Sequence, residues 1–100
     1  FERMLNMGVK MVSGSDSAWM HYRMGGFQYE IIGHAEWGMG NMDAIISGTG
    51  SAADCIGLGD TIGTLEVGKE ADLLLVEGDP STNIWDLLKV KDVFLAGAKI

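Results

Sequence analysis

The stretch that decides the fold is Lys10-Met11-Val12-Ser13-Gly14-Ser15-Asp16-Ser17-Ala18-Trp19. Its apolar run stops at Gly14, and a single acid, Asp16, follows between two serines. A short apolar run that ends on glycine predicts a strand, which we place at residues 9–14, and a polar loop after it. Loops at the C-terminal ends of parallel strands are where α/β proteins build their sites. Asp16 is therefore the first candidate for a functional residue.

The sequence on both sides of this stretch predicts an α/β arrangement. Residues 1–8 resemble the end of a helix, because they close on a glycine that can take the left-handed turn. Downstream, apolar residues recur at helical spacing over residues 27–38 and again over residues 42–56. Gly48 and Gly50 interrupt the second of these helices, each at a cost of about 1 kcal/mol relative to alanine. We therefore expect close packing against a neighbouring segment at these two glycines.

From Gly57 onward the sequence is richer in strand-forming residues. Residues 61–67 and 71–76 predict a hairpin-like pair with Gly68 in its turn. Further along, the pattern predicts a short helical turn over residues 84–88, a strand over residues 90–95, and a hairpin turn at Gly97 into a last strand.

The composition is that of a globular protein and argues against two classes of partner. Hydrophobic residues make up 47% of the chain and charged residues 21%, which does not fit a disordered or collagen-like protein. The 14 acidic and 7 basic residues give a net charge of −7, which disfavours a nucleic-acid partner. No apolar run approaches the ~20 residues that cross a bilayer, and the first residues lack the pattern of a secretion signal. We expect no membrane partner and a cytoplasmic location.

Few residues of the chain have side chains suited to chemistry. A carboxylate at the mouth of a strand, such as Asp16, can hold a metal ion or accept a proton from metal-bound water; the alternative is that it only caps a turn. The two histidines, His21 and His34, lack the spacing of a zinc pair. His21 lies in the candidate loop and either contacts a substrate or is exposed, whereas we interpret His34 as structural. Cys55, which has no cysteine to pair with, is interpreted as a small buried residue.

Residues 48–53 fit the pattern Gly-x-Gly-x-x-Ala of a dinucleotide-binding loop. The helical periodicity continues through these glycines, and the glycines that follow leave too short a crossover helix. We therefore set this interpretation aside.

The most specific pattern of the chain lies in its second part. It reads Gly57-Leu58-Gly59-Asp60-Thr61-Ile62-Gly63-Thr64-Leu65-Glu66-Val67-Gly68-Lys69-Glu70-Ala71-Asp72-Leu73-Leu74-Leu75-Val76, followed by Gly78-Asp79-Pro80. This pattern resembles the C-terminal signature of amidohydrolase-superfamily enzymes, particularly the imidazolonepropionase-like and prolidase-like branch. Upstream, residues 44–53 resemble a helix of that family, and residues 12–16 resemble its eighth barrel strand.

The resemblance implies a fold for each part of the chain. Residues 1–56 would form the last β/α units of a (β/α)8 TIM-type barrel, with strand 8 at residues 9–14 and helices at 27–38 and 42–56. Residues 57–100 would form strands of a small composite β-sandwich. The family's His-x-His, its bridging lysine or glutamate and its later histidines are absent from this sequence. We therefore expect the chain to be the C-terminal piece of a longer protein and incomplete as a stand-alone fold.

The resemblance also implies a chemistry, the metal-dependent hydrolysis of a C–N bond in an amide, a dipeptide or a cyclic amide. One or two divalent ions, usually zinc, would be bound, and Asp16 matches the acid that ligates the metal and shuttles the proton of the attacking water. Trp19, His21 and Arg23 are candidates for substrate binding, and Arg23 either pairs with a substrate carboxylate or remains solvated. The signature residues to which we assign structural roles are Gly63, Gly68, Lys69, Ala71 and Asp72.

Two classes of function remain open at this point. In the first, the chain is part of an amidohydrolase, and the isolated segment is inactive and without a tight zinc site because the other ligands lie elsewhere. In the second, it is a non-catalytic assembly module that associates with the rest of a barrel or with itself through open strand edges.

Overall fold

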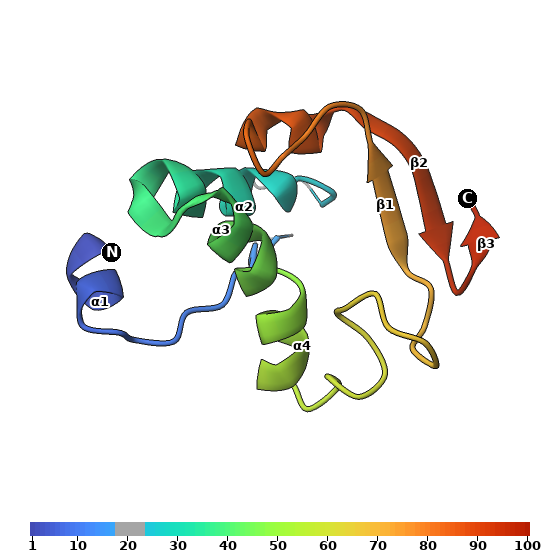
Figure 1. Ribbon diagram of the computed structural model, residues 1–100, viewed down its shortest axis with the longest axis horizontal. Helices are drawn as coiled ribbons and strands as arrows, with labels where there is room; N and C mark the ends of the chain where they lie inside the picture. Colours follow the sequence, from blue (N-terminus) through green and yellow to red (C-terminus); the bar gives the residue numbers. More distant parts are fainter. Residues whose placement is uncertain (18–23) are drawn as a thin grey trace.

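The computed structural model describes residues 1–17 and 24–100, in which helices gather at one end of the molecule and a small sheet stands at the other (Figure 1). No helix in these two ranges is both long and apolar enough to cross a membrane. The elements in chain order are α1 (Glu2–Asn6), α2 (Gln28–His34), the π-helical turn η1 (Ala35–Met39), α3 (Asn41–Ser47), α4 (Gly50–Cys55), β1 (Leu73–Val76), the 3-10 turn η2 (Ile84–Leu88), β2 (Val90–Leu95) and β3 (Ala98–Lys99).

The segment after α1 differs from its prediction in one respect. The helix ends before Gly8, whose φ of 73° is the left-handed turn expected there. Residues 9–14, however, are not a strand, because a strand needs a neighbour for its backbone hydrogen bonds and no described segment lies alongside them in a ladder. Their burial still alternates with the period of a strand. Met11, Ser13, Ser15 and Ser17 are buried or half-buried, whereas Lys10, Val12, Gly14 and Asp16 are exposed.

Each predicted helix of the first part is divided in two. The first becomes α2 and η1, and η1 contains Gly38 at a φ of 107°. The second becomes α3 and α4, which are separated at Thr49 by φ −124° and ψ −95°. The expected close packing is confirmed: a Cβ at Gly48 would stand 2.8 Å from Ile31 Cδ1, and one at Gly50 would stand 3.1 Å from Thr64 Cγ2. Cys55 is exposed, so its interpretation as a buried residue was wrong.

One core joins the two parts of the chain. It contains Ile31 and Ile32 of α2, Ala44 of α3, and Ile84 and Leu87 of η2. Two polar contacts reinforce the same junction. Trp85 Nε1 donates to Glu36 Oε1 at 2.9 Å, and Asn41 Nδ2 donates to the carbonyl oxygen of Ser81 at 3.1 Å. The C-terminal part is therefore held against the helices by η2, which lies near α2 at the top of Figure 1.

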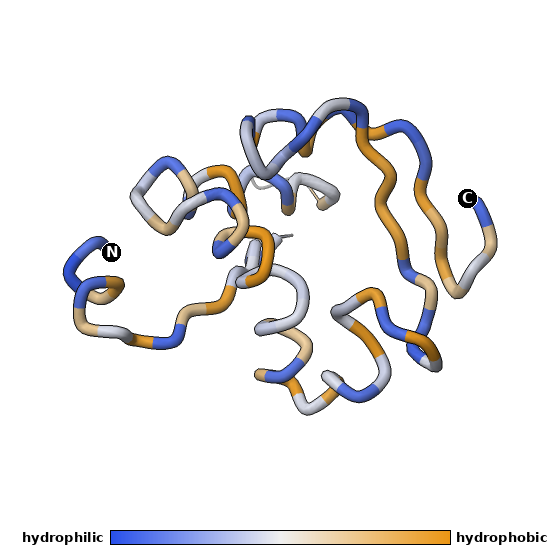
Figure 2. The backbone as a smooth tube through the Cα atoms, in the orientation of Figure 1, coloured by the Kyte–Doolittle hydropathy of each residue, from blue (hydrophilic) through white to orange (hydrophobic). Residues whose placement is uncertain are grey.

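The sheet is antiparallel with strand order β1-β2-β3. Leu73 lies opposite Phe94 and Leu74 opposite Val93, and the register shifts between Leu75 and Val76. The predictions of strands within residues 71–76 and over 90–95, of the turn at 84–88 and of the last hairpin are confirmed. Figure 2 shows how strongly apolar β1 is along its length.

The strand predicted at residues 61–67 is wrong, because this segment forms turns. The ammonium group of Lys69 occupies the middle of the loop. It donates to the carbonyl oxygen of Gly59 at 2.6 Å and to Thr64 Oγ1 at 2.7 Å, and it lies 2.7 Å from Glu66 Oε2. A cation with three donors thus contacts one backbone oxygen and two side-chain oxygens of the loop.

Candidate functional site

Asp16 is exposed at the end of the segment whose burial alternates. Its φ of 47° lies in the left-handed region, which aspartate tolerates better than most side chains because its short polar group can bond locally. Ser15 Oγ accepts a hydrogen bond from the backbone N–H of Ser17 at 3.3 Å. This bond shapes the turn around Asp16. Among the residues that the structure describes, Asp16 is exposed.

Three residues before Asp16, at Ser13, a cluster of three polar side chains connects residues 9–17 to the helices. Ser13 Oγ lies 2.9 Å from His34 Nδ1 of α2 and 2.7 Å from Ser47 Oγ of α3. Ser47 Oγ also donates to the carbonyl oxygen of Ala44 at 2.7 Å, and the backbone N–H of Ser13 donates to the carbonyl oxygen of Ser47 at 3.0 Å. Ser13 and Ser47 are both buried. The segment that leads to Asp16 is therefore fixed to two helices at one point.

Sequence reasoning did not find this cluster. Its members are separated by 21 and 34 residues, and no short motif connects them. Ser47 lies outside the periodic stripe of residues 42–56, so that pattern gave no signal for it. His34 was assigned a structural role from its place beside such a stripe, and the structure gives it a specific partner.

The donors in the described residues do not make a complete metal site. No three His, Cys, Asp or Glu side chains within residues 1–17 and 24–100 lie close enough together to hold an ion. Zinc needs three or four ligands. Asp16, an exposed carboxylate, is chemically suited to be one of them, and the remaining ligands would have to come from outside these residues.

Three of the candidate site residues, Trp19, His21 and Arg23, lie outside the described residues. The signature residues are in the loop before β1 and at its start. Asp72 Oδ1 accepts from the backbone N–H of Ala96 at 2.9 Å, and the carbonyl oxygen of Ala71 accepts from Gly97 at 3.0 Å. These two bonds hold the turn between β2 and β3, whose residues both have positive φ.

The other signature residues shape the loop itself. Lys69 makes the contacts described above, and its hydrogen bond is the main cause that lowers the pKa of Glu66, followed by the hydrogen bond from Thr64. Gly63 has a φ of 96°, and a Cβ there would stand 2.5 Å from Ala53 Cβ. Gly68 has a φ of 93°, with nothing near its Cβ position.

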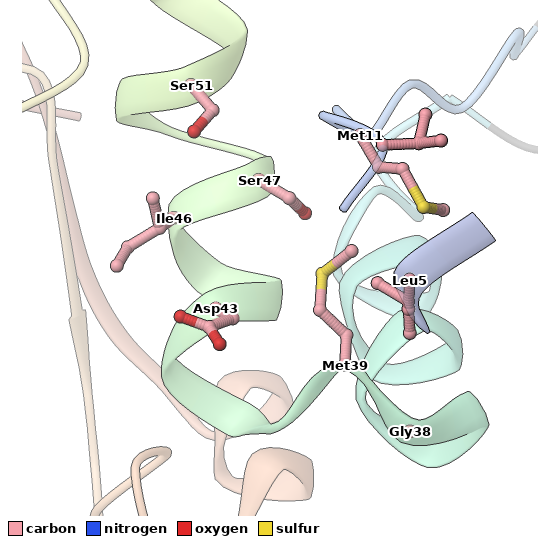
Figure 3. A pocket seen from close by; sticks show the side chains of 9 residues that line it. Leu5, Met11, Gly38, Met39, Asp43, Ile46, Ser47 and Ser51 are labelled. Atoms are coloured by element: carbon pink, nitrogen blue, oxygen red, sulfur yellow. The ribbon is translucent and has the colours of Figure 1, made fainter. Parts of the chain in front are cut away.

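The helical end also contains a cavity of about 370 Å³ between α1, residues 9–11, η1 and α3. Leu5, Met11 and Met39 face one another across it, and Ser47 points toward it from α3 (Figure 3). Among the described residues that line it, Asp43 is the one acid. The cavity lies on the helix side of the segment that carries Asp16, because Met11 and Ser13 share the buried face of that segment.

The chain was compared with known proteins. The profile of the amidohydrolase family matches residues 1–100. Comparison with curated proteins gives no match. Among solved structures, a Xaa-Pro dipeptidase with methionine bound in its active site is 33% identical, with a TM-score of 0.88 over 98% of this chain and 24% of its own. Phenylurea hydrolase B is 34% identical, with a TM-score of 0.74 over 79% of this chain and 17% of its own.

A third similar structure, molinate hydrolase, is 26% identical, with a TM-score of 0.87 over 98% of this chain and 25% of its own. The chain thus spans a quarter or less of the length of each of these three proteins. The matched profile covers every residue, and the dipeptidase covers all but a few of them at more than 30% identity. On this evidence the chain belongs to the amidohydrolase family.

Proposed function

We propose that the chain is the C-terminal part of a metal-dependent amidohydrolase that hydrolyses a C–N bond in an amide, a dipeptide or a cyclic amide. Family membership supports the reaction class. The observation that carries the proposal further is the alternation of burial over residues 10–17, which packs Ser13 on the helices and leaves Asp16 on the open side. This is the arrangement expected of a barrel strand whose outer face touches helices and whose last residue serves a site.

The two parts of the chain would contribute differently to such an enzyme. Residues 1–56 would supply strand 8 of the barrel, at residues 9–14, with the helices that follow it. Residues 57–100 would supply strands of a small β-sandwich. The exposed side of the strand-8 segment, with Val12 and Gly14, would then face the barrel interior. Neighbouring strands would complete the ladder that residues 9–14 lack here.

Asp16 is the residue that we place in the reaction. A divalent ion, most often zinc in this family, supplies a water molecule made acidic enough to attack at neutral pH. Asp16 would be one ligand of that ion. Its second carboxylate oxygen would take the proton of the water and pass it to the leaving amine, as a positioned general base does.

The substrate would be a small amide or peptide. The similar structures include a Xaa-Pro dipeptidase, a molinate hydrolase and a phenylurea hydrolase, and the dipeptidase among them supports a dipeptide as one candidate substrate. Trp19, His21 and Arg23 would line the substrate site from the loop that follows Asp16, with Arg23 pairing with a substrate carboxylate. We place such an enzyme in the cytoplasm, away from nucleic acids and membranes.

Replacement of Asp16 by asparagine in the full-length enzyme tests this role. Asn keeps the size of the side chain and tolerates the left-handed backbone, so only the charge and the proton acceptor are lost. We expect kcat/KM to fall about 100- to 10,000-fold, the usual contribution of a general acid–base group. Asp60→Asn, which removes an exposed acid from the distant loop, should leave kcat/KM unchanged. Equal turnover in Asp16→Asn and the parent would remove Asp16 from the mechanism.

A second candidate, a non-catalytic assembly module, is favoured by one specific observation. Leu74, Val93 and Leu95 share one side of the sheet by register, and their side chains are exposed. An uncovered apolar face of this kind suits association with the rest of a barrel or with a second copy. A full-length protein that binds no metal and hydrolyses no amide, yet forms a defined oligomer, would favour this candidate over the enzyme.

A further inference from the structure

The cluster of Ser13, His34 and Ser47 places two hydroxyl groups in a buried position, which needs an explanation. Ser13 is 7% exposed and Ser47 3% exposed. Burying hydroxyl groups costs free energy unless each finds a partner. Here each does, and the partners come from three separate segments: residues 9–17, α2 and α3.

The positions of the hydrogens follow from counting donors. A carbonyl oxygen can only accept, so the bond from Ser47 Oγ to Ala44 uses the single hydrogen of the Ser47 hydroxyl. The Ser13–Ser47 bond must then use the hydrogen of Ser13. For all of these contacts to be hydrogen bonds at once, His34 Nδ1 has to donate to Ser13 Oγ, because the Ser13 hydroxyl has no second hydrogen. His34 Nδ1 also lies 3.5 Å from Ser47 Oγ, and the same hydrogen is the one available to that contact. The order is His34 to Ser13 to Ser47 to the carbonyl of Ala44.

This order does not contain the hydrogen bond that activates a nucleophilic serine. In a serine hydrolase the hydroxyl donates its hydrogen to the imidazole, which acts as the base. Here the imidazole donates to the hydroxyl, and Ser13 passes its own hydrogen to Ser47. The hydrogen-bond order of the cluster therefore fits a positioning role and not nucleophilic catalysis.

We propose that His34, Ser13 and Ser47 form a directional hydrogen-bond chain that positions Asp16, which makes them positioning residues of the enzyme; this rests on the proposed function. Ser13 is held by its side chain on both sides and by its backbone N–H. Asp16 follows three residues later, no more than ~10 Å of extended chain away. Asp16 itself is exposed among the described residues, so the anchor at Ser13 would fix the direction from which the Asp16 carboxylate enters the site.

The first test needs no activity. In the full-length protein labelled with ¹⁵N-histidine, at a pH where the ring is neutral, the two ring nitrogens of His34 give different shifts when one carries hydrogen and the other does not. We expect hydrogen on Nδ1 and none on Nε2. Hydrogen on Nε2 would overturn the proposal, whatever the protein turns out to hydrolyse.

The second test separates positioning from simple stability. His34→Leu removes the donor, whereas His34→Asn keeps an N–H one bond beyond Cγ, where Nδ1 stands. We expect kcat to fall about 10- to 100-fold in His34→Leu and Ser13→Ala with little change in KM, the effect of a misplaced group, and to recover in His34→Asn. Ser51→Ala is the matched control, because Ser51 lines the cavity that Ser47 also lines and takes no part in the hydrogen-bond chain.

The possible outcomes are distinguishable. Unchanged kcat in both His34→Leu and Ser13→Ala, in a protein that Asp16→Asn inactivates, would overturn the positioning role. Unchanged kcat in Asp16→Asn itself would overturn the proposed function, and the positioning of a catalytic Asp16 would fall with it. Were the variants to fail to fold, the ¹⁵N measurement on the unmodified protein would still decide the direction of the chain.

Discussion

At the scale of single residues, two glycines of the signature make a matched pair. Gly63 and Gly68 have nearly the same φ, 96° and 93°, so alanine strains the backbone equally at both, by about 1–2 kcal/mol. At Gly63 the new methyl would also stand 2.5 Å from Ala53 Cβ and 3.1 Å from the carbonyl oxygen of Thr49. We expect Gly63→Ala to lose about 1–3 kcal/mol more of unfolding free energy than Gly68→Ala, measured by chemical denaturation. Equal losses would contradict the close approach of the loop to α4.

At the scale of elements, Asp86 links η2 to the turn after β1. Its carboxylate accepts from the backbone N–H of Asp79 at 2.9 Å and lies 2.7 Å from Lys89 Nζ. The hydrogen bond from Lys89, and then that from Asp79, hold the pKa of Asp86 below its ordinary value. A carboxyl whose pKa is lower in the folded state adds stability above its unfolded pKa of ~3.9 and loses it as pH falls through the folded pKa.

The consequence for this junction is measurable. As pH falls from about 5 toward the lowered pKa of Asp86, the unfolding free energy of the parent should decrease. The Asp86→Asn variant lacks this contribution at every pH. The two denaturation midpoints should therefore differ at pH 6 and approach each other below pH 4. Asp60→Asn, at an exposed acid that takes part in none of the ion pairs of the described residues, is the control for removal of a surface charge. A constant difference between Asp86→Asn and the parent would show that the ion pair is not the cause.

The sequence alone predicted some of the helices, strands and turns and missed others. The turn at η2, the strands β1 and β2, and the stop at Gly8 carry local signals, and these predictions hold. The strand predicted at residues 61–67 is wrong because this segment forms turns. Lys69 connects Gly59 to Glu66 across the loop, and such a contact exists only after folding. The same reason hides the bonds of Ser13, whose partners come from helices 21 and 34 residues away.

At the scale of the whole molecule, one side of the sheet is apolar and open. Leu74, Val93 and Leu95 are 45%, 37% and 59% exposed. The chain expressed alone should bind a hydrophobic dye and elute as species larger than a monomer, and Leu74→Lys with Leu95→Lys should reduce both effects. Leu65→Lys, at an exposed position in the loop, is the control. A monomeric parent chain without dye binding, shown by light scattering, would contradict this.

The hydrogen bond between Trp85 and Glu36 makes the junction of helices and sheet observable by tryptophan fluorescence. The indole of Trp85 is bonded to a residue 49 positions away and is 48% exposed, whereas Trp37 is 63% exposed. An excited indole senses both its hydrogen-bond partner and the water around it. The emission of Trp85 therefore depends on whether η2 packs on the helices. The wavelength of that emission, and its quenching by a dissolved quencher, both report this packing. A chain with Trp19 and Trp37 both replaced by phenylalanine would keep Trp85 as its single tryptophan, so that the joining of the two parts could be followed in real time.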